Sequence, residues 1–589
     1  MTSVEAAPVA AGSESQGRTR ASAAAPRDVP RWLELASIVV AFAVHVFVQW
    51  RSVAPLFRAD EIGNMGNAYL FAHPDAQWML AGSAYTPGTG LLVAPAWLVT
   101  ADPATAYRIA VAVVALIGVA AIAPLRALAI EFGTAPRLAT VLAAMVVVAP
   151  SRALASNYVW GENLLVLVVA TAALLLVRIG RDPSVRLAAQ VGALAGALFL
   201  AHGRALPFAL AVVVLGALAA RRNSRAAVYL LASGIAALGI AYLLFRYVSD
   251  TIYFDSGRVS KTFDDIAHAD VASYAGLAAG QVWGTVAAWA GVTVIGAASL
   301  LVRARRERWR GGATALAAAT GAMALAVPLL LANDEVIDGR AHVFVYGRYL
   351  DAFLVPLALL GLAALARGIR GRSAWLAVGL GAGAGASSAA VLSAKMPVGS
   401  TDWIVTPAHV PGVAHLMRVV PADGAWPGSW WAVAFLALVP ALLVAVLARR
   451  PAVVLGVLAA LWLALTVYSD VQKFDKFDDP FRTSPVQVDA LDGIDPGVPL
   501  FGDIASPHVL ANGNEFTFWA TPRSFIYMDT SKDTADVQLF LGDTDSVLVT
   551  DGGASPLVDT FVGDAATWVM PGELRDVLEA EGRVLQRRG

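Results

Sequence analysis

The sequence predicts a mainly α-helical protein that crosses a membrane many times and ends in a small soluble domain. Of its 589 residues, 58% are hydrophobic and only 15% are charged, whereas an ordinary soluble domain carries about 25% charged residues. Long apolar runs recur from residue 32 to residue 469. After residue 470 the chain becomes richer in Gly, Asp, Pro and Thr, with short β-prone runs. We therefore expect a polytopic transmembrane helical bundle followed by an α/β or α+β domain.

The apolar runs set the expected number of membrane-spanning helices. A helix needs roughly 17–25 apolar residues to cross about 30 Å of hydrocarbon. By this length rule we expect about thirteen spans, two of them at its lower limit. The predicted spans are 32–50, 104–130, 136–150, 162–179, 187–203, 205–220, 226–245, 281–302, 312–332, 350–367, 373–394, 429–448 and 451–469.

Arginine is distributed unevenly between the connecting loops, which predicts the orientation. Cytoplasmic loops are enriched in Lys and Arg. If the N-terminal tail is cytoplasmic, alternation of the spans places every short, Arg-dense loop on that side. These loops and the tail hold Arg18, Arg20, Arg27 and Arg31; Arg126 and Arg137; Arg178, Arg181 and Arg186; Arg221, Arg222 and Arg225; Arg303, Arg305, Arg306, Arg308 and Arg310; Arg367, Arg370 and Arg372; and Arg449 and Arg450. The pattern predicts a multi-pass protein of a bacterial plasma membrane, with its N-terminus cytoplasmic.

The longer loops then lie outside the cytoplasm, together with the C-terminal domain. They are 51–103, 151–161, 246–280, 333–349 and 395–428. Loops of this kind usually carry binding and catalytic residues. The predicted organisation is a disordered cytoplasmic tail (1–30), a transmembrane domain (31–469) and an extracytoplasmic soluble domain (470–589). The tail lacks the short apolar core and cleavage site of a signal peptide.

Composition also excludes several kinds of chemistry. The chain has no cysteine, which excludes disulfides, thiolate metal sites and cysteine nucleophiles. Neither its net charge of −1 nor any basic cluster suggests nucleic acid, so we expect no nucleic-acid partner. The expected surroundings are membrane lipid and extracytoplasmic molecules.

The first external loop begins with two adjacent carboxylates, Asp60 and Glu61, just after an apolar run. One interpretation is structural: Asp60 caps a helix and Glu61 complements its dipole. The alternative is functional, because ionisable groups at a membrane boundary are costly and usually have a role. Residues 62–71 predict a short amphipathic helix. Residues 88–99 are apolar but too short to span, so we expect them in the interface plane.

The C-terminal domain shows runs typical of strands bounded by turns. We expect strands at 498–502, 516–520, 524–528 and 546–550. Residues 571–579 predict a closing helix.

Four segments in this order carry a resemblance to a known family. The acidic pair Asp60 and Glu61 is followed by Tyr69; residues 85–92 read YTPGTGLL; residues 149–152 and 158–162 read APSR and YVWGE; and residues 346–356 read YGRYLDAFLVP. Together they resemble the GT-C superfamily of polytopic glycosyltransferases, which use lipid-phosphate sugars. The branch most similar contains protein O-mannosyltransferases and bacterial lipid-A aminoarabinose transferases. The resemblance covers roughly residues 32–370, and the Ala- and Arg-rich composition suggests an actinobacterial source.

The resemblance implies an inverting transfer from a polyprenyl-phosphate sugar donor to an extracytoplasmic glycan, lipid or protein acceptor. It makes Asp60 the candidate base, with Glu61 orienting the acceptor or assisting. The candidates for holding the departing phosphate are Arg204, Arg348, Tyr349 and Arg340, and those for contacting the sugar or acceptor are Tyr69, Tyr85, Tyr158 and Glu162. For the arginines, the alternative interpretation is snorkelling to lipid headgroups.

A metal requirement and the function class stay open at this point. Asp264, Asp265, His268 and Asp270, and likewise Asp334, Glu335 and Asp338, form acidic clusters. Hard-cation ligands look like this, but so do solvated carboxylates. No fixed ligand spacing is present, so we assign no metal site and no certain cofactor, and leave a divalent cation open. The alternative functions are a transporter or flippase of lipid-linked sugars, and a non-catalytic wall-assembly protein.

Overall fold

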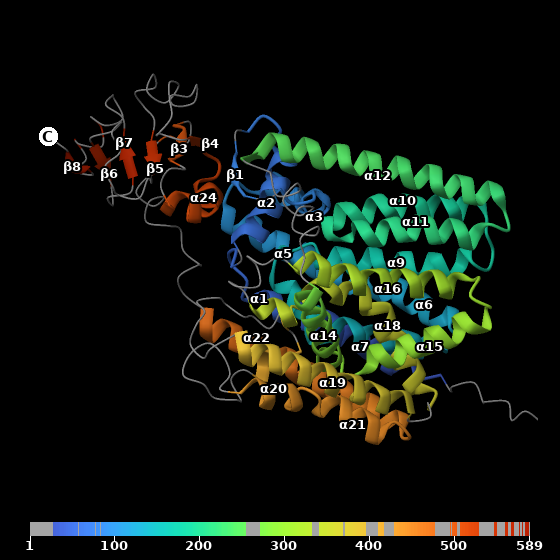
Figure 1. Cartoon of the computed structure of the whole chain (residues 1–589). Coiled ribbons are helices and arrows are strands. Elements are labelled where there is room, and N and C mark those ends of the chain that lie inside the picture. The colour runs from blue at the N-terminus through green and yellow to red at the C-terminus, as the bar shows by residue number, and fades with distance from the viewer. Residues whose placement is uncertain are drawn as a thin grey trace, which may run out of the picture.

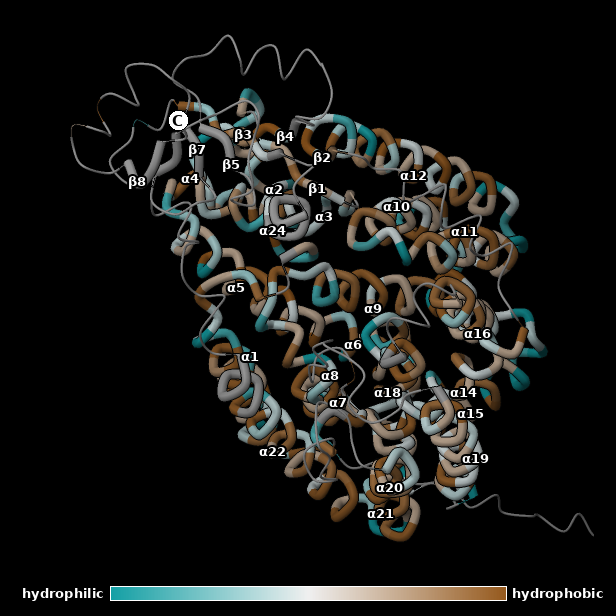
Figure 2. Tube along the Cα trace, turned by 60° about the vertical axis from the view of Figure 1, so that its left-hand side comes forward, coloured by the Kyte–Doolittle hydropathy of each residue, from teal (hydrophilic) through white to brown (hydrophobic). Residues whose placement is uncertain are grey.

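A computed structural model shows a bundle of long helices with a small sheet-containing domain at one end (Figure 1). The structure describes residues 28–56, 58–76, 78–82, 84–254, 271–332, 341–368, 372–395, 410, 412–416, 429–477, 495, 498–503, 507–528, 547–549, 560–562, 567–569, 577, 580 and 584–587. Within these ranges ten helices are long and apolar enough to cross a membrane, or twelve if each of two bent pairs is one span. In Figure 2 hydrophobic residues run along the lengths of these helices. The predicted polytopic helical fold is confirmed.

Each predicted span has a helical counterpart among the described residues. α10 has 17 residues and falls just short of the length test. The helices of the bundle are α1 (Arg31–Trp50), α5 (Pro103–Ala120), α6 (Ile122–Glu131), α7 (Pro136–Val148), α9 (Glu162–Ile179), α10 (Val185–Ala201), α11 (Leu206–Ala220), α12 (Ser224–Ile252), α14 (Val271–Ala288), α15 (Val292–Arg306), α16 (Gly312–Leu331), α18 (Arg348–Ala366), α19 (Arg372–Lys395), α20 (Trp430–Leu436), α21 (Val439–Leu447) and α22 (Pro451–Phe477).

The predicted span at 281–302 is interrupted between residues 288 and 292. The chain there forms α14 and α15, whose axes meet at 103°. Ala290 has φ 51° and Gly291 has φ 74°, left-handed conformations that an α-helix cannot continue through. A second bend of 65° separates α7 from α8 (Pro150–Ala153) and the 3-10 turn η1 (Leu154–Asn157). Pro150 lacks the N–H that would continue α7.

The Arg-rich connections gather at one end of the bundle. Arg178 and Arg181 both pair with Glu131, with Arg178 Nε 2.8 Å from its carboxylate. Arg367 Nη1 donates to the carbonyl of Phe132 at 3.2 Å, and the Arg303 guanidinium lies 5.0 Å from the Phe132 ring. The turns after α6, α9, α15 and α18 therefore meet, as alternation of the spans requires. The side of the membrane that this end faces stays a prediction.

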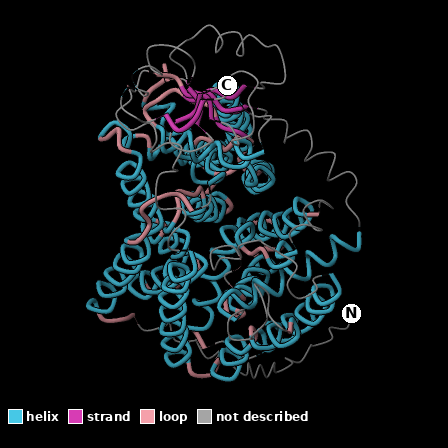
Figure 3. The backbone as a smooth tube through the Cα atoms, turned by 90° about the vertical axis from the view of Figure 1, so that its left-hand side faces the viewer, coloured by secondary structure: helices cyan, strands magenta, loops and turns pink. Residues whose placement is uncertain are grey.

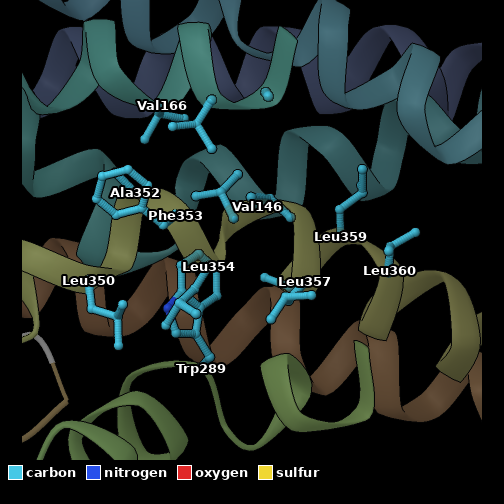
Figure 4. Close-up of a cluster of buried hydrophobic side chains, with 14 of the residues drawn as sticks. Val146, Val166, Trp289, Leu350, Ala352, Phe353, Leu354, Leu357, Leu359 and Leu360 are labelled. Atoms are coloured by element: carbon cyan, nitrogen blue, oxygen red, sulfur yellow. The ribbon is translucent and has the colours of Figure 1, made fainter. Parts of the chain in front are cut away.

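Helix α18 is the centre of the bundle. In its apolar span 89% of the residues are buried. Figure 4 shows its side chains Phe353 and Leu357 among those of neighbouring helices. Glycines bring α15 against it: a Cβ on Gly296 would lie 1.8 Å from the Leu357 carbonyl oxygen, and a Cβ on Gly361 2.0 Å from that of Val292. Such close packing fixes α18, and with it the residues at its N-terminus.

The loop at 51–103, which the sequence predicts to be the first external loop and which keeps that name below, is folded, as expected. It forms α2 (Arg58–Ala72), the short strand β1 (Leu80–Ala81), α3 (Gly88–Val93) and α4 (Pro95–Val99). β1 pairs in parallel with β2 (Tyr253–Phe254), which follows α12. The loop thus packs as a layer over one end of the bundle (Figure 1).

The C-terminal domain contains a sheet, drawn in magenta in Figure 3. Its strand order is β4-β3-β5-β7-β6-β8. The strands are β3 (Leu500–Asp503), β4 (Phe525–Met528), β5 (Val547–Val549), β6 (Thr560–Val562), β7 (Thr567–Val569) and β8 (Val584–Arg587). β3 pairs in parallel with β4 and β5, while the remaining pairs are antiparallel. Three of the predicted strands are confirmed, as β3, β4 and β5.

The predicted strand at 516–520 is wrong, because these residues belong to helix α24 (Pro507–Ala520) between β3 and β4. The aromatic run has strand propensity, but α24 buries Phe518 against the first external loop, and tertiary packing overrides propensity. Most of the predicted closing helix at 571–579 lies outside the described residues.

Candidate functional site

Four charged side chains from distant parts of the chain meet where the first external loop covers the bundle. We call Asp60, Glu162, Arg204 and Arg348 the ionic cluster. Arg348 Nη1 lies 2.5 Å from Asp60 Oδ2, and Arg348 Nε lies 2.5 Å from Glu162 Oε1. Arg204 Nη2 donates to the same Glu162 oxygen at 3.1 Å and to the backbone carbonyl of Arg348 at 3.3 Å. The predicted base candidate and two predicted phosphate ligands therefore belong to one network.

Burial within the ionic cluster is graded. The side chains of Glu162, Arg204 and Arg348 are 1%, 5% and 6% exposed, whereas that of Asp60 is 28% exposed. Buried charges are tolerated when they are paired, and here two carboxylates balance two guanidinium groups. Asp60 is the member of the network that is partly open to the surface.

The helix ends explain why the pairing is needed. Arg348 starts α18 and Glu162 starts α9. The positive end of a helix dipole favours Glu162 and disfavours Arg348, so Arg348 depends on its carboxylate partners. Gly161 brings the segments together: a Cβ there would lie 2.4 Å from the carbonyl oxygen of Ala201, at the end of α10.

Aromatic rings fix the two guanidinium planes. The Arg348 guanidinium lies 3.5 Å from the centroid of Trp160, and Tyr158 stacks on Trp160 with 4.0 Å between ring centroids. The Arg204 guanidinium lies 4.7 Å from the ring of Tyr349. Cation–π contacts of this kind favour arginine over lysine. Tyr349 is therefore part of the site, while Tyr158 contributes indirectly by stacking on Trp160.

Both oxygens of the Asp60 carboxylate have partners. Tyr85 OH donates to Oδ1 at 2.7 Å, and Arg348 faces Oδ2. Burial raises the pKa of Asp60, but attraction to Arg348 and the hydrogen bond from Tyr85 lower it by more, so the pKa lies below its ordinary value. Asn64 Nδ2 also donates to the Asp60 carbonyl at 2.9 Å. Asp60 is thus ionised near neutral pH and held toward Arg348.

Glu61 points into the protein rather than toward Arg348. It is fully buried, and it accepts hydrogen bonds from the amides of Leu56 (2.8 Å) and Val159 (3.0 Å) and from the hydroxyl of Tyr107. These contacts tie the loop after α1 and the turn before α9 to helix α2. This position favours orientation of the neighbouring Asp60 over direct contact with an acceptor.

The other predicted site residues divide between the site and its surroundings. Tyr85 and Glu162 belong to it. Tyr69 does not: it lies nine residues after Asp60, about 13.5 Å along α2. Its ring packs against Trp78 and Trp97, each at 5.1 Å between centroids. Arg340 lies outside the described residues.

Three residues beside the ionic cluster were not among the predicted site residues. Trp160 and Tyr346 lie inside the segments that carried the resemblance, and His202 lies two residues before Arg204. Arg204 Nη1 lies 3.1 Å from His202 Nε2. Burial and the nearby Arg204 lower the pKa of His202 to about 3, so a neutral ring accepts this hydrogen bond. In the sequence each of the three lies two residues before a predicted site residue: Glu162, Arg348 or Arg204.

A second buried pair lies deeper in the bundle. Arg152 Nη2 is 3.7 Å from Asp351 Oδ2, and Trp289 Nε1 donates to Asp351 Oδ1 at 3.1 Å. Asp351 follows Arg348 by one helical turn, so this pair fixes the start of α18 against the segment after α7.

The part of the chain that the structure describes contains no group of three or more His, Asp or Glu side chains placed to hold a metal ion. Both acidic clusters noted in the sequence, at 264–270 and 334–338, lie outside the described residues.

Comparison with known proteins identifies the fold. No protein-family model matches the chain, and no curated protein matches it in sequence. The crystal structure of ArnT from Cupriavidus metallidurans bound to undecaprenyl phosphate matches 92% of this chain and 97% of its own, with 17% identity and a TM-score of 0.52. ArnT in the apo state matches the same shares at 15% identity, with a TM-score of 0.51. The chain has the GT-C fold.

The GT-C fold confirms the resemblance predicted from short segments. An oligosaccharyltransferase from Archaeoglobus fulgidus in the apo form also matches, with 14% identity and a TM-score of 0.40, over 89% of this chain and 70% of its own. In this GT-C chain, each of the four segments contributes a side chain at or beside the ionic cluster: Asp60, Tyr85, Glu162 and Arg348.

Proposed function

We propose that this GT-C protein is a membrane glycosyltransferase that moves a sugar from a polyprenyl-phosphate donor to a hydroxyl group of an extracytoplasmic acceptor. One observation carries the proposal: the partly exposed carboxylate of Asp60 lies 2.5 Å from the buried guanidinium of Arg348. A base and a phosphate-binding cation are thus adjacent at the end of the bundle that holds the folded external loop. The solved ArnT structure with undecaprenyl phosphate supports a donor of this class.

The proposed reaction is a single displacement. The acceptor hydroxyl donates its proton to Asp60 while its oxygen attacks the anomeric carbon of the donor. The bond between that carbon and the phosphate oxygen breaks, and its electron pair leaves with the polyprenyl phosphate. The configuration of the sugar is inverted because attack and departure occur on opposite faces. A positioned general base typically contributes about 10²–10⁴-fold to such a step.

Arg348 and Arg204 are the proposed ligands of the departing phosphate. Negative charge grows on the phosphate as the bond breaks, and preorganised cations stabilise it best in a site shielded from water. Both guanidinium groups are already oriented by Glu162 and by aromatic rings. Glu162 is therefore proposed to hold the arginines rather than to contact the sugar. Tyr85, which is only partly buried beside Asp60, is better placed for contact with sugar or acceptor.

Sharing Arg348 couples the two steps. The incoming phosphate competes with Asp60 for the Arg348 guanidinium. An Asp60 carboxylate released from Arg348, next to a phosphate, holds a proton more strongly. Donor binding therefore makes Asp60 a stronger base at the moment when one is needed.

The acceptor class is proposed more broadly, as a glycan, lipid or protein outside the cytoplasm. A flippase or transporter would place its charged site near the bilayer midplane, at interrupted helices. Here Asp60 lies on the external loop and the paired arginines lie at helix ends. This arrangement favours the enzyme.

The test is transfer by purified protein in liposomes that contain a labelled polyprenyl-phosphate sugar and a panel of acceptors. Wild-type protein should release polyprenyl phosphate in proportion to the labelled product, and Asp60→Asn should not. Asp102→Asn is the matched control, because Asp102 lies on the same loop and only caps α5. Translocation of the intact labelled lipid to the other leaflet, without cleavage of the sugar–phosphate bond, would instead show a flippase.

A further inference from the structure

The C-terminal domain is joined to the first external loop by a line of hydrogen bonds that we call the seam. Asn514 of α24 bonds both backbone groups of Ala81: Ala81 N donates to its Oδ1 at 2.7 Å, and its Nδ2 donates to Ala81 O at 3.0 Å. Thr517 Oγ1 donates to Met79 O at 3.1 Å, and Trp78 Nε1 donates to Thr517 O at 3.0 Å. Side chain–backbone hydrogen bonds therefore join α24 to a segment more than 430 positions away.

One isolated β-bridge also crosses the seam, between the C-terminal sheet and the segment before β1. Met79 N donates to the carbonyl of Phe525 in β4 at 3.2 Å, and Trp78 forms a parallel bridge with Phe525. On its other side, β1 pairs with β2 at the end of α12. Residues 78–81 are thus held between the C-terminal domain and the membrane bundle.

Two contacts carry the seam into helix α2, which bears Asp60. Trp78 packs directly on Gly66: a Cβ there would lie 2.4 Å from the Trp78 ring. Phe518 of α24 lies edge-on to Tyr107, with 6.4 Å between ring centroids. The hydroxyl of Tyr107 in turn bonds Glu61, the residue next to Asp60. The C-terminal domain is therefore linked to the middle of α2 through Trp78 and to the start of α2 through Tyr107.

We propose that the C-terminal domain positions the base, with Asn514, Thr517 and Phe518 holding α2 so that Asp60 lies against Arg348. These are positioning residues, since they act on Asp60 through the packing of α24 on α2, the 78–81 segment and Tyr107. The consequence for catalysis rests on the function proposed above, but the effect on α2 does not. Without the seam, the first external loop keeps only its contacts with the bundle, and α2 becomes free to shift.

The pH dependence follows from what surrounds Asp60. The groups that face it are Arg348, Tyr85, Glu162, His202 and Tyr346. Arg348 and the Tyr85 hydrogen bond lower its pKa, while burial and Glu162 raise it. Movement of α2 away from Arg348 weakens all of these contributions together, and those that lower the pKa prevail in sum. The pKa of Asp60 then rises, and the acid limb of the rate profile moves to higher pH.

The first experiment measures hydrogen–deuterium exchange in the full-length protein, without any substrate. Asn514→Ala and the milder Phe518→Leu should speed exchange in residues 58–72 by about tenfold, because local opening becomes easier, and leave α9 and α18 unchanged. Leu548→Ala is the control: Leu548 lies in β5, paired with Phe501 and Trp568, away from the seam. Unchanged exchange in 58–72 for both seam variants would overturn the inference.

The second experiment measures the pH–rate profile of sugar transfer for the same variants. Seam variants should lower turnover about tenfold, less than the 10²-fold expected for a full 1 Å misplacement, with little change in donor KM. Their acid limb should move to higher pH. A seam that merely adds stability would lower the melting temperature without moving that limb, and this result would also overturn the proposal. If the wild type transfers no sugar but exchange in 58–72 responds, the proposed function fails and the positioning inference stands.

Discussion

Arg348 Nη1 lies 2.5 Å from the carboxylate of Asp60, and this pair joins the external loop to the most buried helix of the bundle. Asp60 comes from a loop and is partly open to the surface, whereas Arg348 begins a helix fixed by close packing. A change in the position of the loop therefore alters one defined contact, the Asp60–Arg348 ion pair. Most of the following predictions concern this contact and the groups that hold it.

Replacing Asp60 by Asn should separate turnover from donor binding. Turnover should fall by about 10²–10⁴-fold, because the base is lost. Donor affinity should be unchanged or tighter by a few-fold, because the phosphate no longer competes with a carboxylate for Arg348. Rates and donor Kd measured side by side, with Asp102→Asn as control, decide this. Near-normal turnover in Asp60→Asn would remove Asp60 as the base.

The rate should depend on the ionised form of Asp60. Its pKa lies below the ordinary value, and a depressed carboxyl pKa means that the charged form persists until the pH falls through it. The acid limb of kcat/KM, which reports the free enzyme, should therefore lie below about pH 4. Tyr85→Phe removes one hydrogen bond that lowers this pKa, so its acid limb should lie higher. An identical limb in Tyr85→Phe would show that another group titrates.

The two arginines should respond differently from membrane anchors. Loss of one preorganised contact to a developing charge costs about 10²–10³-fold in turnover, which is the expectation for Arg348→Ala and Arg204→Ala. Arg348→Lys keeps the charge but loses the fork and the planar stacking on Trp160, so it should recover only part of the rate. Full recovery with Lys, together with a loss under about threefold in Ala, would indicate headgroup anchoring.

Glu162 tests the distinction between holding the site and binding sugar. It is 1% exposed and pairs with Arg204 and Arg348. Glu162→Gln leaves two buried cations with one remaining carboxylate, and breaking a buried pair costs about 3–5 kcal/mol. We expect a lower melting temperature in detergent even without donor. A variant with normal stability and only a raised acceptor KM would instead place Glu162 at the sugar.

Hydropathy predicted the helices well, because a helix that crosses lipid needs a long run of apolar residues, and such a run can be read directly from the sequence. It could not predict the bend between α14 and α15, which depends on left-handed conformations at Ala290 and Gly291. Nor could it predict α24, whose aromatic residues have strand propensity but pack as a helix on the external loop.

The site was predictable in its members more than in its geometry. Asp60, Arg204 and Arg348 stood out because charges at the ends of apolar runs are costly. Glu162 pairs with Arg204 and Arg348 across 42 and 186 positions, and Asp60 pairs with Arg348 across a still longer separation. No local pattern encodes these contacts. Tyr69 was predicted from its place after the acidic pair, but the helical rise carries it to a different part of α2.

The orientation of the bundle can be tested with single cysteines, because the chain contains none. The distribution of arginine predicts that the C-terminal domain and the first external loop lie outside the cytoplasm. A cysteine at Ser524 should react with a membrane-impermeant maleimide in intact cells. A cysteine at Arg222, exposed in the turn after α11, should react only after lysis. Because the seam ties the C-terminal domain to the loop that bears Asp60, the Ser524 result also places the proposed reaction. Labelling at Arg222 in intact cells, with none at Ser524, would put that reaction on the cytoplasmic side.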